Sequence, residues 1–315
     1  MTRKIIIDCD PGMDDSVAIL LALNNPEVEV IAITTTHGNV GVDTATKSAL
    51  KILELTGNTD IPVFSGMPQP MIRPRPVDPF SHGEDSQGEN FLPEPTLSEK
   101  PINAVQALID LIEQVPGEIH LVATGPLSNI AMAMRQQPGI ADSLAGITAI
   151  SGLFGLNRQG WENATGDNPS SEWNVFVDPE AAEIVYKSAP RLRAIGLDIA
   201  TVFDSDFNEQ QLSRLDQSQN PAAAFLAQAI RFTTARGYLA YTAVIDAFAV
   251  ASVIHPEMLE FTKAQVGIST SNDITRGMSV LESRHHHQWE DLPTVEIAVS
   301  ANYQEFLELL VSSFE

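Results

Sequence analysis

The sequence predicts an α/β fold, namely a single open, mainly parallel but mixed sheet with helices on both faces. Short apolar runs alternate along the chain with longer segments of helical periodicity, which is typical of βα units around a parallel sheet. The 315 residues show no internal repeat and no clear linker. We therefore expect one domain that spans residues 1–315.

The first half of the chain is predicted to contain five strands and four helices. The strands are Lys4–Asp10, Val28–Thr35, Ile61–Phe64, Ile119–Ala123 and Ile147–Ser151. The helices are Ser16–Asn24, Thr44–Leu55, Ile102–Val115 and Leu127–Arg135, of which the first stops before Pro26 and the second at Gly57. Residues 66–101 contain eight prolines and little periodicity, which indicates a long surface loop that is either functional or mobile.

The second half begins with another predicted loop, residues 153–172, which is rich in glycine and asparagine. A helix is expected after it, with Asp178 as its N-cap and Pro179 at the first helical position. A strand follows at Leu192–Leu197, and residues 205–260 are expected to be mostly helical. A last strand at Thr294–Val299 precedes a closing helix.

The chain is strongly acidic, with 41 Asp and Glu against 18 Lys and Arg and a formal charge of −23. Such a field repels nucleic acid and anionic lipid, so a neutral small molecule or a cation is the expected partner, although acidity for solubility alone explains the surface equally well. No apolar run reaches the roughly 18 residues of a membrane span, and the apolar start is too short for a signal peptide. The single cysteine, Cys9, excludes an internal disulfide and fits a cytoplasmic protein.

The most informative segment is residues 8–15, Asp-Cys-Asp-Pro-Gly-Met-Asp-Asp, between the first predicted strand and the first helix. This turn lies at the carboxyl edge of the sheet, where open α/β folds bind their ligands. Its four carboxylates exceed what helix capping requires, and like charges at close range raise one another's pKa. A hard cation removes this conflict, and oxygen ligands suit calcium or magnesium. We therefore predict a metal site, with helix capping plus solvated charge as the alternative.

Carboxylates beside a metal can also orient and deprotonate a water molecule, so the predicted site is catalytic in principle. The sequence contains no Walker-type lysine loop and no Gly-x-Gly-x-x-Gly motif, so it does not indicate phosphate binding. A thiolate mechanism through Cys9 is weakly supported, because a buried cysteine at a strand end is the more common case.

Residues 8–15 are similar to the amino-terminal signature of the inosine–uridine-preferring nucleoside hydrolase family. Other segments resemble the motifs of that family in the expected order: Thr36–Asn39, His82–Glu84, Val122–Asn129, Glu172–Asn174, Asp178–Ala181 and Asp246. The first motif is highly specific for the family. Each of the others is weak evidence by itself, but together they support the resemblance. The resemblance covers nearly the whole chain. It implies a Rossmann-like nucleoside hydrolase fold and calcium-dependent hydrolysis of ribonucleosides to ribose and free base.

The resemblance also implies roles for individual residues. The Ca²⁺ ligands would be Asp10, Asp15, the main-chain carbonyl of Thr124 and Asp246. Asp10 would be the catalytic residue that takes a proton from the metal-bound water. The substrate-binding residues would be Asp14 at the ribose 2′-hydroxyl, Asn39 at the water or the ribose, and Glu172 and Asn174 at the 3′- and 5′-hydroxyls. By family analogy, the protein would form a homodimer or a homotetramer.

Elementary chemistry agrees with these residue types. Breaking the ribosyl bond builds oxocarbenium character, which nearby carboxylates stabilise. Asp246 stands in an apolar helical stretch, where an unpaired carboxylate is costly, so a ligand role is favoured over a satisfied core residue. Taken alone, Asn39, Glu172 and Asn174 would more often be polar groups of turns and loops. His285–His287 is more typical of a solvated loop than of a metal site.

The sequence departs from the family pattern where many members have a histidine that protonates the departing base. This chain has Ile245 there, which provides neither an acid nor an aromatic ring. Tyr238, Tyr241 and His82 are the candidates that could replace it. The family also usually has an asparagine in the loop before its Glu-x-Asn motif. In this chain an ungapped match puts Gly166 at that position, and the neighbours Asn163 and Asn168 could substitute for it. We take Asn168 as a substrate-binding candidate. We therefore expect ribose and metal recognition to be intact and activation of the leaving group to differ from that of the family.

Two alternative functions remain. Asp8 and Asp10 also match the Asp-x-Asp start of a haloacid-dehalogenase-type phosphohydrolase, but that chemistry needs a phosphate-binding lysine and a later acidic pair, for which Asp204 and Asp206 are poor substitutes. The second alternative is a non-catalytic or altered-specificity riboside-binding protein, which Ile245 favours. The presence of both Asp10 and Asp14 favours catalysis, because pure binding has less use for a base beside a metal.

Overall fold

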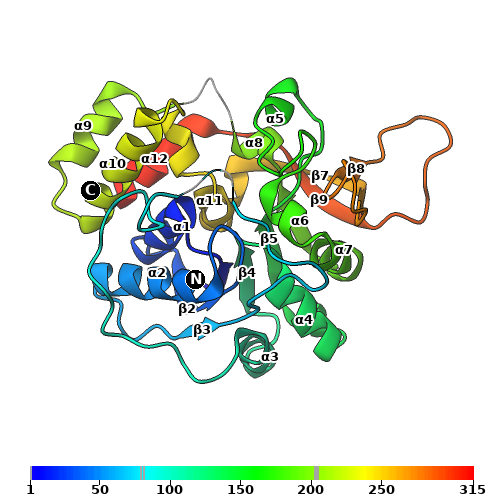
Figure 1. Ribbon diagram of the computed structural model, residues 1–315, viewed down its shortest axis with the longest axis horizontal. Coiled ribbons are helices and arrows are strands. Elements are labelled where there is room, and N and C mark those ends of the chain that lie inside the picture. The colour runs from blue at the N-terminus through cyan, green and yellow to red at the C-terminus, as the bar shows by residue number, and fades with distance from the viewer. Residues whose placement is uncertain (1, 79, 81, 202–205) are drawn as a thin grey trace.

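The computed structural model describes residues 2–78, 80, 82–201 and 206–315, and its centre is one nine-stranded sheet of order β3-β2-β1-β4-β5-β6-β9-β7-β8 (Figure 1). The first seven strands in this order pair in parallel, and β7 joins β9 and β8 in antiparallel fashion. The strands are β1 (Arg3–Cys9), β2 (Val28–Thr35), β3 (Val63–Ser65), β4 (Ile119–Ala123), β5 (Gly146–Ile150), β6 (Leu192–Ile195), β7 (Leu259–Ile268), β8 (Ser279–Leu281) and β9 (Thr294–Ala301). The predicted mainly parallel, mixed α/β sheet is confirmed.

Helices cover both faces of the sheet, as predicted. The α-helices are α1 (Met13–Leu23), α2 (Val42–Thr56), α3 (Ala104–Gln114), α4 (Ser128–Gln136), α5 (Arg158–Glu162), α6 (Trp173–Val177), α7 (Pro179–Ser188), α8 (Leu197–Ala200), α9 (Glu209–Gln217), α10 (Pro221–Ala235), α11 (Ala247–Ile254) and α12 (Tyr303–Ser313). Short 3₁₀ turns are η1 (Ile140–Ser143), η2 (Ala240–Ala243) and η3 (Pro256–Met258). None of the helices in the described part of the chain combines the length and apolarity needed to cross a membrane.

Side chains along β1 point alternately to the two faces of the sheet, and this explains why the protein has a hydrophobic core on each face. Ile5 and Ile7 point to one face and pack with α1, α2, α10, α11 and α12, whereas Ile6 points to the other face and packs with α3, α4 and α7. All three isoleucines are fully buried. A parallel strand covered on both faces reads as a continuous apolar run, which is the pattern that predicted β1.

The structure contains two strands that the sequence analysis did not predict, β7 and β8. β7 is half exposed, and its polar residues interrupt the apolar alternation that marks a buried strand. Its position is set by pairing with β9 rather than by its own pattern. The turn that joins β8 to β9, residues 282–293, projects from the body of the molecule (Figure 1).

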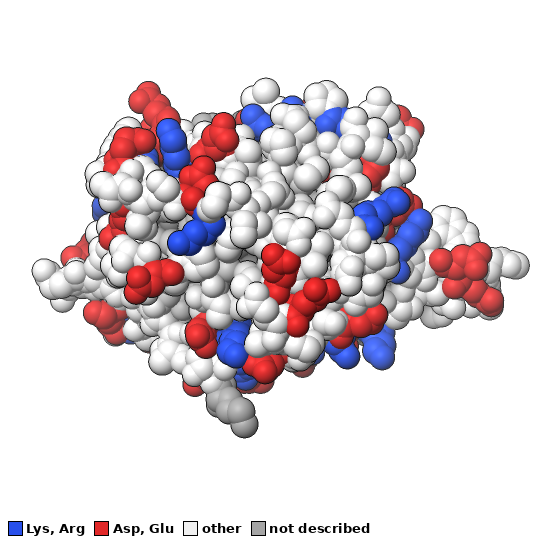
Figure 2. Space-filling view, turned by 90° about the horizontal axis from the view of Figure 1, so that it is seen from below, with Lys and Arg blue, Asp and Glu red and all other residues white. Residues whose placement is uncertain are grey.

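Charged side chains of both signs are mixed on the face shown in Figure 2, and most of that face is uncharged. The net charge of −23 is therefore not gathered into one acidic patch on this face. This distribution agrees with a general role of the exposed acidic residues in solubility.

Residues 66–78, which we call the strap, cross the carboxyl edge of the sheet without helix or strand structure. The backbone of Met67 accepts a hydrogen bond from the N–H of His37 at 3.1 Å and donates one to Asn129 Oδ1 at 2.8 Å. Further along, Arg73 forms an ion pair of 2.6 Å with Glu180, and both side chains are only 13% exposed. The proline-rich loop is thus fastened by polar contacts, and it leads directly to Asp78, Phe80 and His82 at the site described next.

Candidate active site

A cavity of about 600 Å³, counted with its open mouth, lies at the carboxyl edge of the sheet. The strand order reverses around β1, which has β2 on one side and β4 on the other, and such a switch point is where open α/β folds bind ligands. The polar residues that line the cavity are Asp14, Asn39, Asp78, His82, Thr124, Thr165, Glu172, Asn174, Thr242 and Asp246. The apolar lining residues are Met13, Phe80, Ile150, Trp173, Leu197 and Ile245.

Asp15 is the most firmly held carboxylate of the acidic turn. Its oxygens accept the backbone N–H of Gly12 at 3.1 Å and that of Asp10 at 3.3 Å. They also accept the Thr124 hydroxyl at 2.6 Å and the Asn39 amide at 3.2 Å. These bonds cap the start of α1, which therefore begins at Met13, three residues earlier than predicted.

Asp10 is fully buried and has one satisfied oxygen and one free oxygen. Its Oδ2 accepts the backbone N–H of Asn39 at 2.5 Å, whereas Oδ1 has no hydrogen-bond partner among the described residues. Gly38 and Gly125 enclose this carboxylate closely: a Cβ atom would lie 1.9 Å from Oδ2 at Gly38 and 2.5 Å from Oδ1 at Gly125. The backbone approaches Asp10 at a distance that only glycine permits.

Asp14, Asp15 and Asp246 bring a carboxylate oxygen each to within 4.8 Å of one another. Asp10 does not belong to this group of three, but its negative charge acts on Asp246. Burial, followed by repulsion from Asp14, Asp15 and Asp10, raises the pKa of Asp246 well above its ordinary value. The pKa of Asp14 rises to about 6, again mainly through burial. Concentrated carboxylates of this kind are the arrangement that a bound cation would stabilise.

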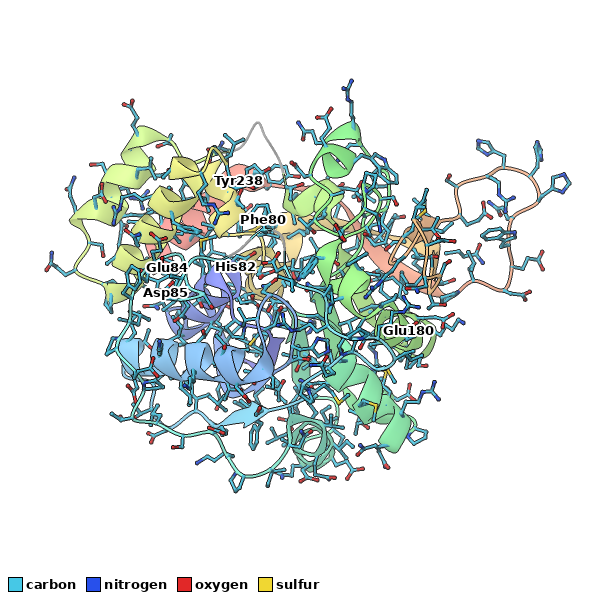
Figure 3. The ribbon with its side chains drawn as sticks, in the orientation of Figure 1. Phe80, His82, Glu84, Asp85, Glu180 and Tyr238 are labelled. Atoms are coloured by element: carbon cyan, nitrogen blue, oxygen red, sulfur yellow. The ribbon has the colours of Figure 1, made fainter. Side chains whose placement is uncertain are left out.

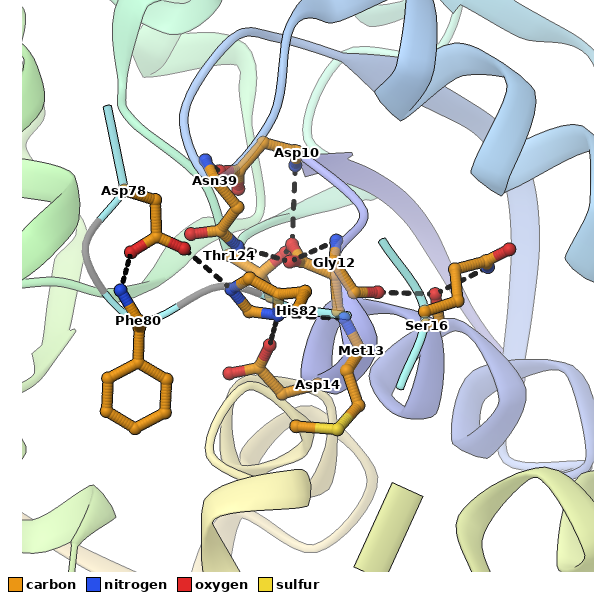
Figure 4. A network of polar contacts seen from close by, with 12 residues as sticks. Asp10, Gly12, Met13, Asp14, Ser16, Asn39, Asp78, Phe80, His82 and Thr124 are labelled. Atoms are coloured by element: carbon orange, nitrogen blue, oxygen red, sulfur yellow. Dashed lines mark hydrogen bonds and ion pairs between the residues drawn. The ribbon is translucent and has the colours of Figure 1, made fainter. Parts of the chain in front are cut away.

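His82 is held between two carboxylates, as Figure 4 shows. Its Nδ1 accepts the backbone N–H of Met13 at 3.1 Å and lies 3.6 Å from Asp14 Oδ1, while Nε2 lies 3.4 Å from Asp78 Oδ2. Burial alone would lower the pKa of this imidazole, but Asp78 and Asp14 outweigh it and raise the pKa. The bond from Met13 identifies Nδ1 as an acceptor, so the proton of the neutral ring is on Nε2 and points toward Asp78.

Glu172 and Asn174 join the start of α6 to the ends of two strands. The Glu172 carboxylate caps α6 by accepting the N–H groups of Asn174 at 2.6 Å and Val175 at 3.0 Å, and it also accepts that of Gly152 at 3.2 Å. Burial nevertheless raises the pKa of Glu172 to about 7. The Asn174 amide donates to the carbonyls of Thr124 at 2.7 Å and Ile150 at 3.2 Å, which orients its own oxygen away from the strands.

A buried chain of polar groups lies behind the cavity. His37 Nε2 is 3.0 Å from Ser128 Oγ, and the Ser128 hydroxyl donates to Asp178 Oδ2 at 2.6 Å. The single hydroxyl proton is used by Asp178, so His37 must be the donor to Ser128. This series of hydrogen bonds connects the segments that follow β2 and β4 to the N-terminus of α7. It does not resemble a nucleophilic triad, in which the histidine stands between the serine and the aspartate.

Several predicted residues lie outside the cavity lining. Asn168 holds its own loop, because its side chain bonds Ser170, Ser171 and the carbonyl of Arg276. Tyr241 is not a lining residue, and the Tyr238 ring packs against Phe80 in a tilted arrangement with ring centroids 4.5 Å apart (Figure 3). Of the three candidate proton donors, His82 alone lines the cavity in the described part of the chain.

Two other motifs of the sequence do not contribute to the site. His285–His287 is exposed in the projecting turn and joins no group of three ligating side chains among the described residues. Asp206 accepts the backbone N–H groups of Ala240 and Tyr241 and is absent from the cavity lining, whereas Asp204 lies outside the described residues.

Sequence reasoning missed Asp78, Phe80 and Leu197 at the cavity. Leu197 could have been found, because it ends a predicted strand and the carboxyl ends of parallel strands face ligands. Asp78 and Phe80 carried no such signal, since they stand in the proline-rich loop without periodicity.

Comparisons with known proteins agree over nearly the whole chain. The family model for inosine-uridine preferring nucleoside hydrolases matches residues 5–308. The pyrimidine-specific ribonucleoside hydrolase RihA of Shewanella sp. (strain MR-7) is 32% identical over 320 residues, which cover 99% of this chain and 96% of the relative. The probable uridine nucleosidase 2 of Arabidopsis thaliana is 33% identical over 324 residues, covering 98% of this chain and 96% of the relative.

Solved structures show the same similarity. The purine-preferring ribonucleoside hydrolase from Gardnerella vaginalis superposes with a TM-score of 0.84 at 27% identity, covering 99% of this chain and 98% of that one. A plant nucleoside hydrolase superposes with a TM-score of 0.83 at 29% identity, covering 100% of this chain and 99% of that one.

Proposed function

The chain belongs to the inosine-uridine preferring nucleoside hydrolase family and is a hydrolase of N-glycosyl compounds, and from this premise we propose that its cavity hydrolyses ribonucleosides with the help of calcium. One observation carries the proposal: Asp14 and Asp246, which line the cavity, and the buried Asp15 each bring a carboxylate oxygen to within 4.8 Å of one another.

The residues present fit a calcium ion. Asp10 Oδ1 and Asp14 Oδ1 are buried atoms without a hydrogen-bond partner among the described residues, and unsatisfied buried carboxylate oxygens are costly. The groups proposed as ligands offer only oxygen atoms, which suits a hard cation. We assign the ion to Asp10, Asp15, the carbonyl of Thr124 and Asp246. Bound calcium supplies positive charge that offsets the carboxylates and makes a nearby water easier to deprotonate.

Asp10 is the proposed general base. Its Oδ2 is oriented by the N–H of Asn39, and its free Oδ1 is available to accept a proton from the attacking water. The buried carboxylates near it also stabilise the positive charge that develops on the ribose as the bond to the base breaks.

The remaining polar residues would hold the ribose. Asp14 offers Oδ1, which has no hydrogen-bond partner among the described residues and lies 3.6 Å from His82 Nδ1, and the oriented Asn174 side chain offers its carbonyl oxygen. Asn39, Glu172 and His82 also line the cavity, and their side chains can form hydrogen bonds with the sugar hydroxyls. Homodimer and homotetramer are both retained for the assembly, and light scattering of the purified protein would decide between them.

The test is release of reducing sugar from inosine, adenosine, uridine and cytidine, with and without a calcium chelator. We expect sugar release that the chelator abolishes and that Asp10→Asn lowers by roughly 100-fold or more. Asp216→Asn, which changes an exposed carboxylate 64% accessible, is the matched control and should behave as the unchanged protein. Absence of release from every nucleoside, with folded protein and bound calcium, would refute the proposal.

A second candidate function is riboside binding without turnover. Ile245 lines the cavity beside Asp246 and has no proton to give to a departing base. Saturable, calcium-dependent binding of ribonucleosides with no sugar release would establish this second function.

A further inference from the structure

A second cavity lies at the amino edge of the sheet, opposite to the cavity described above. It measures about 1080 Å³, counted with its open mouth. Its lining comes from the amino ends of β4, β5, β6 and β9 and from the middle of β7. The strand β4 runs from this cavity, which His120 lines, to the first one, which Thr124 lines just beyond the strand. The two cavities are therefore separate, and we call the second one the amino-edge pocket.

A row of polar side chains crosses five neighbouring strands at this pocket. Arg193 on β6 is in register with Thr148 on β5 and with Glu296 on β9, and Glu296 is in register with Lys263 on β7. Paired residues of neighbouring strands direct their side chains to the same face of a sheet. His120 on β4 joins the row, because its Nε2 lies 2.9 Å from Thr148 Oγ1. Parallel strands covered on both faces are normally apolar, so this row marks a part of the face that is left open.

The amino-edge pocket has an excess of positive charge, although the whole chain carries a charge of −23. Its three cations are Arg191, Arg193 and Lys263. The one carboxylate among its described lining residues is that of Glu296, so two positive charges are left without a counter-charge in the lining. Burial, and then neighbouring arginine side chains, lower the pKa of His120 to about 4. The imidazole is therefore neutral at pH 7 and adds no further charge.

The Arg191 side chain is held in place and still has free donors. Its Nη1 donates to the carbonyls of Leu144 at 2.8 Å and Asp142 at 3.3 Å. Its Nε and Nη2 have no hydrogen-bond partner among the described residues. A guanidinium that is already oriented loses little conformational entropy when it binds an anion.

Arg193 and Lys263 also keep donors available. Arg193 Nε donates to Glu296 at 2.8 Å, and the guanidinium lies 5.0 Å from the centroid of the Phe261 ring. Both Nη atoms of Arg193 lack a hydrogen-bond partner among the described residues. The Lys263 ammonium group forms neither an ion pair nor a hydrogen bond within the described part of the chain. The pocket thus combines two oriented guanidinium groups with one unpaired ammonium group.

We propose that the amino-edge pocket binds a small molecule that carries a phosphate group, either free phosphate or a sugar phosphate. Such a group has close to two negative charges at neutral pH, which matches the excess of positive charge in the lining. Its oxygens accept the paired hydrogen bonds that guanidinium groups donate. A long polyanion such as nucleic acid is repelled by the acidic remainder of the chain, so the ligand is small. This site is separate from nucleoside hydrolysis and does not depend on it.

The first test is calorimetric titration of the full chain, with a calcium chelator present, with inorganic phosphate, ribose 5-phosphate and acetate. We expect one of the two phosphates to bind with a Kd below about 1 mM, and acetate to bind at least about 10-fold more weakly. A Kd for ribose 5-phosphate at least about 10-fold below that for inorganic phosphate identifies a sugar phosphate as the ligand, and closer values identify free phosphate. Acetate binding as tightly as both phosphates, or neither phosphate binding below about 1 mM, would overturn the inference.

Variants locate the bound phosphate. Lys263→Gln and Arg191→Gln should each raise the Kd by about 10-fold, because each removes a charged donor. Lys263→Arg keeps the charge and should stay within about threefold of the unchanged protein. Lys47→Gln, which alters a lysine 62% exposed on α2, is the matched control and should not change the Kd. The same Kd in Lys263→Gln, Arg191→Gln and Lys47→Gln would place the phosphate elsewhere and refute the assignment.

His120 gives an independent readout inside the pocket of the unmodified protein. A negative charge close to an imidazole favours its protonated form, so bound phosphate should move the pKa of His120 from about 4 back toward 6.5. NMR titration of the histidine resonances with and without phosphate measures this change, and His120→Gln identifies the signal. The exposed His286 should titrate alike in both conditions. A pKa of His120 that does not respond to saturating phosphate would contradict binding in this pocket.

Discussion

Gly38 limits how the Asp10 carboxylate can be placed. A Cβ atom at this position would lie 1.9 Å from Asp10 Oδ2 and 2.8 Å from the Pro126 ring, both inside contact distance. We expect Gly38→Ala to displace the carboxylate, to lower kcat by roughly 100-fold and to cost about 1–3 kcal/mol of folding free energy. Steady-state kinetics and urea unfolding measure the two effects.

Gly41 provides the matched control, because nothing lies within 4 Å of a Cβ atom built there and its φ of −70° is ordinary for alanine. Gly41→Ala should leave kcat unchanged and alter stability by less than about 1 kcal/mol. Equal losses of activity in both variants would mean that the contact with Asp10 is not the cause.

His37 gives the folded protein a pH dependence with a defined sign. Burial, and then the positive charge of Arg75, lowers its pKa to about 4 from an ordinary 6.5. The ring therefore stays neutral in the folded state while the unfolded chain binds a proton below pH 6.5, so stability is present above that pH and is lost as the pH falls toward 4. This single group accounts for a loss of about 2 kcal/mol between pH 7 and 5.

The variant His37→Gln keeps an N–H donor for Ser128 but cannot be protonated. Its loss of stability between pH 7 and 5 should therefore be about 2 kcal/mol smaller than that of the unchanged protein, as measured by urea unfolding at each pH. His286→Gln, in the exposed turn, should keep the original pH dependence. Parallel curves for all three proteins would rule out this role of His37.

Among the elements, the strap is held by arginine side chains. Arg73 pairs with Glu180 at 2.6 Å and also donates to the carbonyls of Thr270 and Ser271, so one side chain fastens the strap to α7 and to the end of β7. Arg75 reaches the carbonyl of Gly38 at 3.2 Å. These contacts place Asp78 and His82 at the cavity.

Removal of Arg73 should loosen the strap. We expect Arg73→Ala to lower stability by about 2 kcal/mol, because it leaves a mostly buried Glu180 without its partner, and to speed proteolytic cleavage within residues 66–101. Arg158→Ala, which removes an ion pair whose arginine is 89% exposed, should change stability by less than about 0.5 kcal/mol. Identical cleavage rates in the two variants would contradict a fastening role for Arg73.

At the scale of the whole molecule, calcium and pH should act together on stability. Burial raises the pKa of Asp10 and Asp246 in the metal-free protein, so their effect on stability is favourable at low pH and is lost as the pH rises through the folded-state pKa. Calcium should reverse this loss by offsetting the ionised carboxylates. At a concentration a hundred times its Kd, the ion would add about 2.7 kcal/mol.

We therefore expect the calcium-induced rise in Tm to be larger at pH 7.5 than at pH 5. Thermal unfolding with chelator and with excess calcium at the two pH values measures it, and Asp15→Asn should show little calcium effect at either pH. The difference between the two curves isolates the ion, because His37 and His120 titrate equally in both. A Tm that does not respond to calcium at pH 7.5 would refute the assigned metal site.

Local patterns in the sequence determined much of the fold. Three examples are the apolar run of β1, the glycine that ends α2 and the Asp-Pro start of α7. Each of these signals lies within a few consecutive residues, because strand periodicity and helix capping involve groups that are close along the chain. The same local reading placed the acidic turn at the carboxyl edge, whereas the Glu172–Asn174 motif was predicted only from its resemblance to the family. By contrast, β7 depends on a partner strand, and its own half-polar sequence did not reveal it.

The tertiary structure alone decided how the charged groups meet. The Asp246 carboxylate lies beside those of Asp14 and Asp15 although the residues are far apart in the sequence. Asp78 forms an ion pair with His82 within a loop that has no periodicity. The three N–H groups on Glu172 and the N–H of Met13 on His82 determine which atoms are free, and no spacing rule predicts them. The physical reason is that hydrogen bonds and electrostatic interactions depend on distance in space, whereas a sequence pattern records only distance along the chain.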